Sequence, residues 1–195
     1  WQKCQAIFLI KFGVILRLKE FDRRLEGSNT MLKNLNLTFG PEKQLQEIIE
    51  NNKDRQMVLL ESVTDSEKFA LLDISNEESI FHSQLDYRIY HTINLKEWNG
   101  FFEFRYVTLD TEQQKIFNAH LGKWDDPFNR PVGLKSTLVG HDERKDYEFL
   151  MINIWEDQED YVEWENESDN EFREFGHGGN AKALVAQYKL VKNKE

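Results

Sequence analysis

The sequence predicts an α+β protein made of two similar halves, and three observations support this class. First, short segments with alternating or continuous apolar residues recur between turn residues along 34–191, as β-strands do. Second, segments with apolar residues three or four positions apart separate some of these strands, as in amphipathic helices. Third, the elements predicted for residues 98–195 follow the order β-α-β-β-α-β, which is the ferredoxin-like order, and residues 31–97 repeat part of it.

The first half is predicted to contain four strands and one helix. The segment NLNLTF alternates with a period of two, and Gly40 and Pro41 then open a helix with a narrow apolar stripe. The segments QMVLLESV and KFALLDIS are predicted to form a hairpin around residues 64–67, and DYRIYHTI a further strand. The first half therefore has the order β-α-β-β, followed by a loop and a last strand.

The second half begins after a turn at Asn99 and Gly100. Its predicted strands are residues 101–109, 134–140, 146–156 and 183–191. Asp110 or Thr111 can cap the helix that follows the first of these strands. A second helix follows Trp155, and residues 168–171 (SDNE) have the spacing of a capping box that begins another short helix.

The predicted central strand is apolar on both faces. Its odd-numbered residues from Tyr147 to Trp155 point to one side, and Leu150, Ile152 and Ile154 point to the other. Such a strand is covered on both faces, whereas the helices of one ferredoxin-like half cover only one. We therefore expect a second sheet, supplied by the first half as an internal pseudo-dimer or by another subunit in a homodimer.

Composition and charge exclude some classes of function. The chain has 195 residues and a formal net charge of −10, although residues 1–30 carry six basic and only three acidic side chains. A strongly acidic body repels phosphate backbones, so we expect no nucleic-acid partner. Cys4 is the single cysteine, which excludes an intrachain disulfide and a Cys-based zinc site and suits the cytoplasm.

Residues 1–30 differ from the rest of the chain. Their apolar segment 6–18 is interrupted by Lys11 and is too short to span a bilayer, so we expect no membrane insertion. Regular alternation begins only after Met31. Residues 1–30 are then either an extension that is not native or a genuine N-terminal helix, followed by one half at 31–97 and the other at 98–195.

The stretch IWEDQEDYVEW carries a family resemblance. A strand ends at Trp155, Glu156 follows, and Tyr161 and Trp164 lie on the next helix. This pattern resembles the signature of the haem-degrading branch of the antibiotic-biosynthesis-monooxygenase (ABM) domain family, whose members are dimeric α+β barrels. The two-part layout is most similar to HmoB-type haem-degrading monooxygenases and TRAP-like proteins. The resemblance implies an oxidoreductase that uses haem as substrate and cofactor, with an external electron donor.

The same resemblance implies a haem site. Trp155 matches the tryptophan that ends the central strand and presses against the macrocycle. His177 is the nearest candidate for the iron ligand, one residue beyond the family position, which Gly176 occupies. The family's asparagine on the first strand is missing. Glu103 stands nearest to its position, with Phe104 and Arg105 as the alternatives. The complete predicted site comprises Trp155 and Glu103 as catalytic residues, His177 as the metal ligand, and Asn153, Phe117 and His120 as further haem-binding residues, with His120 the rival ligand.

Each of these residues also has a structural interpretation. Trp155 can close the core between strand and helix, His177 can lie in a surface loop, and His120 can lie at the edge of the core. Glu103 and Arg105 share one strand face and can form a local ion pair. The missing asparagine and displaced histidine therefore leave a second function class open: a non-catalytic ABM-fold protein with a binding or stress-signalling role. In either class the expected ligand is haem or another flat aromatic small molecule.

Overall fold

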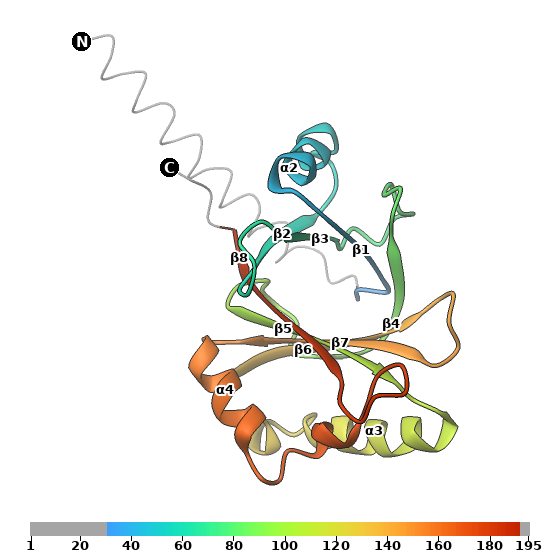
Figure 1. Cartoon of the computed structure of the whole chain (residues 1–195), viewed down its shortest axis with the longest axis vertical. Helices are drawn as coiled ribbons and strands as arrows, with labels where there is room; N and C mark the ends of the chain where they lie inside the picture. Colours follow the sequence, from blue (N-terminus) through green and yellow to red (C-terminus); the bar gives the residue numbers. More distant parts are fainter. Residues whose placement is uncertain (1–30, 192–195) are drawn as a thin grey trace, which may run out of the picture. The chain divides into compact units, whose positions relative to one another are not determined.

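The computed structural model describes residues 31–191, so the expectations about residues 1–30 lie outside the described residues. Eight strands in the described part of the chain close into one barrel in the order β1-β3-β2-β8-β5-β7-β6-β4 (Figure 1). Every neighbouring pair of strands is antiparallel. The predicted α+β class with two ferredoxin-like halves is confirmed.

The two halves repeat one strand order. The elements of the first half are β1 (Asn34–Gly40), α2 (Glu42–Asn51), β2 (Met57–Ser62), β3 (Phe69–Asp73) and β4 (Leu85–Ile93). Those of the second half are β5 (Phe101–Thr108), α3 (Thr111–Lys123), β6 (Leu134–Asp142), β7 (Glu148–Trp155), α4 (Gln158–Asn166) and β8 (Leu184–Leu190), with 3₁₀ helices η1 (Pro127–Asn129) and η2 (Glu171–Glu174). The order β4-β1-β3-β2 in one half matches β8-β5-β7-β6 in the other, so the halves are tandem copies of one arrangement.

The barrel closes because the last strand of each half pairs with a strand of its own half on one side and with a strand of the other half on the other side. Strand β4 pairs with β6, and β8 pairs with β2. The first half therefore supplies the second sheet within one chain, as the two-faced central strand requires. Leu150, Ile152 and Ile154 of β7 are fully buried on the barrel side, and the opposite side of β7 belongs to a separate core cluster with the helices.

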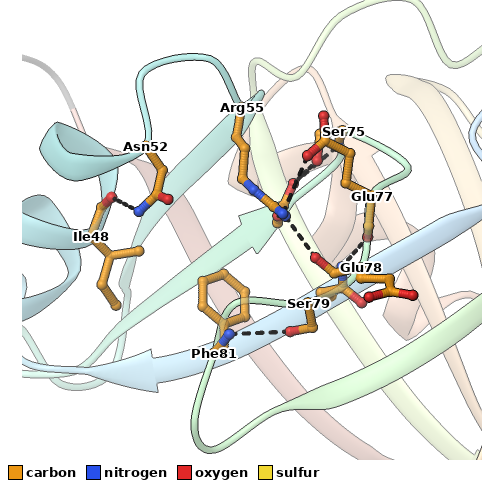
Figure 2. Close-up of polar contacts among 10 residues, drawn as sticks. Ile48, Asn52, Arg55, Ser75, Glu77, Glu78, Ser79 and Phe81 are labelled. Atoms are coloured by element: carbon orange, nitrogen blue, oxygen red, sulfur yellow. Dashed lines mark hydrogen bonds and ion pairs between the residues drawn. The ribbon is translucent and has the colours of Figure 1, made fainter.

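Helices cover the outer faces of the barrel. Helix α2 packs on the first half, with Leu45 in one cluster with Leu59, Leu71 and Phe81, while α3 and α4 lie on the second half (Figure 1). Between β3 and β4 the first half has a loop in place of a second helix. Figure 2 shows Arg55 reaching this loop, where its Nη1 donates to the Glu78 carbonyl at 2.9 Å.

The helix caps explain where the site helices begin. The Asp110 side chain accepts from the backbone N–H groups of Glu112 and Gln113, which makes Asp110 the cap of α3. The predicted capping box at 168–171 is wrong. Asn170 caps η2 instead, because its side chain accepts from the N–H of Phe172 at 3.0 Å and donates to the Trp164 carbonyl at 3.2 Å.

Among residues 31–191, no helix is long and apolar enough to cross a membrane.

Candidate functional site

An aromatic layer fills the space between the outer face of β5 and β7 and the helices of the second half. Trp155 is its centre, with no exposed surface and ring centroids 5.0 Å from Trp164 and 6.1 Å from Tyr161. The other aromatic members are Phe101, Phe117, Trp124, Phe149, Phe172 and Phe175. The indole Nε1 of Trp155 is buried and has no hydrogen-bond partner in the described residues. A buried donor of this kind is available to an acceptor on a ligand.

A row of polar side chains crosses the sheet beneath this layer. Thr137, Asn153, Glu103 and Gln187 lie directly opposite one another on β6, β7, β5 and β8. The Thr137 hydroxyl donates to Asn153 Oδ1 at 2.7 Å, and Asn153 Nδ2 donates to Glu103 Oε2 at 2.9 Å. Two predicted site residues, Asn153 and Glu103, are therefore in direct contact, and Asn153 is two residues from Trp155 on the same face of β7.

Arg105 extends the row towards α4. Its Nε donates to Glu103 Oε1 at 2.7 Å, its Nη2 donates to Glu165 Oε2 at 2.5 Å, and its guanidinium lies 5.3 Å from the centre of the Trp164 ring. The ion pair expected between Glu103 and Arg105 is present. It is buried, with side-chain exposures of 0% and 2%, rather than close to water.

Electrostatics keep Arg105 charged. Burial by itself opposes the charge on Arg105, but the carboxylates of Glu103 and Glu165 outweigh it and raise the pKa of the guanidinium. Burial also raises the pKa of Tyr161 to about 12, with the charges of Glu103 and Glu165 adding to this effect. Tyr161 therefore presents a neutral hydroxyl to the row at physiological pH.

His177 lies away from Trp155. Its Nδ1 is 3.1 Å from Glu148 Oε2, and the same carboxylate accepts a hydrogen bond from Thr108 at 3.0 Å. Glu148 is the first residue of β7 and Trp155 is the last. At about 3.3 Å per residue, the two ends of this strand are about 23 Å apart. The structure therefore does not bring His177 and Trp155 to the same place.

His120 lies at the edge of the aromatic layer. Its Nδ1 is 3.0 Å from Glu171 Oε2 and its Nε2 is 3.0 Å from Glu174 Oε1, so the ring links α3 to η2. Phe117, on the same helix, is fully buried and packs edge to face on Phe172 and Phe175. Phe117 is therefore part of the layer itself, whereas His120 has a carboxylate beside each ring nitrogen.

The positions of Trp155, His177 and His120 decide whether this site can hold a haem group. As the side chains stand, they do not form a pocket in which one haem contacts Trp155 and is ligated by His177. Residues 31–191 also contain no group of three or more His, Cys, Asp or Glu able to hold a metal ion. What the layer offers is a set of aromatic faces, one free indole N–H and a buried row of hydrogen-bonding groups.

A groove of about 520 Å³ adjoins the layer, and Trp124, Trp164 and Phe172 form part of its lining. Its rim includes Phe128 of η1, which is 96% exposed. The sequence analysis predicted only a loop at residues 125–133, whereas the structure has the short helix η1 there, with Pro127 and Pro131 on either side of Phe128. Thr137, Glu165 and Gln187 were also missed, because isolated polar residues in a strand or helix give no signal until the strands are paired.

Comparisons with known proteins agree with this architecture. No family model and no curated protein matches the sequence. Among solved structures, a monooxygenase-like protein from Listeria innocua has a TM-score of 0.70 and 20% identity, covering 84% of this chain and 96% of its own. A ferredoxin-fold protein related to antibiotic biosynthesis monooxygenases, from Listeria monocytogenes, has a TM-score of 0.67 and 20% identity, with coverages of 83% and 95%.

A haem-degrading enzyme from Listeria monocytogenes is similar as well, with a TM-score of 0.63 and 20% identity over 80% of this chain and 99% of the enzyme. Identities at this level establish a shared fold. The residues of the layer and the row are therefore interpreted from their own geometry. The chain has the fold of the two-part ferredoxin-like proteins related to antibiotic biosynthesis monooxygenases.

Proposed function

We propose that this protein binds haem, or another flat aromatic molecule, against Trp155 in the layer between β7 and α4. The observation that carries the proposal is the buried polar row beside an unpaired indole N–H within aromatic packing. Packing alone does not explain a charged pair here, because well-packed apolar residues of similar volume are often as stabilising as a buried ion pair. Recognition of a ligand would explain why the polar row and the indole N–H lie within the aromatic layer.

Each part of the layer has a role in such binding. The face of Trp155 packs on the flat ligand and its Nε1–H donates to a ligand acceptor. Phe117 and Trp164 supply apolar walls, and Asn153 holds the orientation of Glu103. Haem would supply the oxygen chemistry itself when bound.

The same residues favour binding over turnover. Where the family resemblance places an amide donor, Glu103 places a carboxylate, which disfavours a build-up of negative charge nearby. Ligation of iron by His177 or His120 would require the imidazole to leave its carboxylate partners. We therefore propose a haem-binding protein with slow monooxygenase activity, and the second candidate is a binding protein without turnover.

The layer is filled by side chains, so binding requires α4 to move outward. This helix has nine residues and is held mainly by Tyr161 and Trp164, which are its buried residues. Short helices of this kind, fixed by few contacts, belong to the part of a fold that opens most readily. The groove along Trp164 adjoins the layer at this helix.

Titration of the purified protein with haem tests the proposal. We expect a shifted Soret band on binding, with loss of the band over time in ascorbate if turnover is slow and a persistent band if there is none. Trp155→Phe keeps most of the packing but removes the N–H, so it should weaken binding. Trp98→Phe is the matched control, since Trp98 is 8% exposed and outside the layer.

Absence of any Soret shift in the wild-type protein would refute the proposal. Equal effects of the two tryptophan substitutions would show that Trp155 acts only through packing. His177→Ala addresses iron ligation separately: a lost shift means that the loop after η2 rearranges to reach the iron, and an unchanged shift means that His177 stays with Glu148.

A further inference from the structure

Arg105 has two carboxylate partners in very different surroundings. Glu103 belongs to the same strand and is fully buried, while Glu165 comes from α4 and its side chain is 30% exposed. Both contacts are short, at 2.7 Å to Glu103 and 2.5 Å to Glu165. The guanidinium thus has one inner partner fixed to the sheet and one outer partner on a helix.

The two partners are not equally necessary. One carboxylate neutralises the buried arginine, and Glu103 already does so within the sheet. Glu165 brings a second negative charge that the pair does not need for neutrality. Because Glu165 is partly solvated, its carboxylate can return to water at a much smaller cost than that of Glu103.

The position of Trp164 connects this anchor to the aromatic layer. Trp164 precedes Glu165 on α4, packs on Trp155 at 5.0 Å between ring centroids, and lies over the Arg105 guanidinium. A flat molecule that replaced the Trp164 ring against Trp155 would lie within reach of the Arg105 guanidinium, which is 5.3 Å from the centre of that ring. A carboxylate on the edge of such a molecule reproduces the contact that Glu165 makes, with the same charge and the same hydrogen bond.

We infer that Arg105 is the anchor for the carboxylate of an aromatic acid, and that Glu165 occupies this anchor until the ligand displaces it. The inference rests on the proposed function and narrows its ligand class to flat aromatic molecules that carry a carboxylate. Release of Glu165 also removes one of the contacts that hold α4 on the sheet, so displacement of Glu165 and opening of the layer are the same event.

Two metal-free porphyrins test the inference without iron ligation. Protoporphyrin IX carries two carboxylates, and its dimethyl ester has the same ring without them. Both are titrated into the full chain, with quenching of tryptophan fluorescence as the readout. Glu165→Gln weakens the internal competitor and leaves Arg105 in place, while Glu163→Gln makes the same charge change at an exposed position of α4. Thermal melts establish that both variants are folded.

We expect Glu165→Gln to bind the acid about five- to tenfold more tightly than the wild-type protein, since hydrogen bonds to charged groups exceed neutral ones by about 1 kcal/mol or more. Affinity for the ester should be unchanged, and Glu163→Gln should change neither. A gain shared by acid and ester, a gain shared by both variants, or no gain overturns the anchor but leaves the proposed function standing. Failure of both porphyrins to bind any form of the protein overturns the anchor, and the haem titration then decides separately whether the proposed function stands.

Discussion

Replacement of Glu103 by glutamine is the most direct test of the buried row. The side chain keeps its size but loses its charge, so Arg105 remains buried with Glu165 as its single carboxylate partner. Removal of one member of a buried ion pair costs about 3–5 kcal/mol. Because Glu165 still neutralises part of the charge, we expect the lower end, about 3 kcal/mol of lost unfolding free energy.

Urea unfolding followed by tryptophan fluorescence measures this loss. Glu61→Gln is the control, because Glu61 forms a partly exposed pair with Lys189 at 3.5 Å, and such pairs contribute about 1 kcal/mol or less. Arg105→Met and the double variant complete a double-mutant cycle. The double variant should be more stable than the sum of the single losses predicts, since it leaves no unpaired buried charge.

Two results would refute this reasoning. A Glu103→Gln protein within about 0.5 kcal/mol of the wild type would mean that the pair is not desolvated as the structure has it. Strictly additive losses in the cycle would mean that Glu103 and Arg105 do not interact, whatever their distance.

Two further predictions concern other parts of the fold. The hydrogen bond from Lys123 lowers the pKa of Glu171 below its usual 4.5, so its stabilisation is present above pH 4.5 and lost as pH falls through the lower folded pKa. The melting temperatures of the wild type and Lys123→Met should therefore differ above pH 4.5 and converge below it. The exposed control Lys145→Met should show no such pH-dependent difference from the wild type. A difference between wild type and Lys123→Met that does not depend on pH would contradict this prediction. Residues 98–195 alone should dimerise or aggregate in light scattering, because the barrel face of β7 loses its cover; a soluble monomeric fragment would disprove this.

Much of the fold could be predicted because its signals are local. Alternation in NLNLTF, the Gly40–Pro41 helix start and the Asp110 cap each depend on residues within a few positions of one another. The need for a second sheet could also be predicted, because a strand that is apolar on both faces must be covered by another layer on each face. The capping box at 168–171 failed because a contact from Asn170 to the Trp164 carbonyl fixes the turn differently.

The sequence by itself determined the elements, their order in the second half and the fact that Trp155 ends a buried strand. Only the tertiary structure decided that the barrel closes within one chain, that Asn153 contacts Glu103, and that Arg105 reaches Glu165, which is 60 positions away. It also decided that His177 meets Glu148 at the far end of β7 from Trp155. The physical reason is that strand pairing sets which distant side chains become neighbours. The alternation within one strand shows which face each residue takes, but not which strand lies beside it.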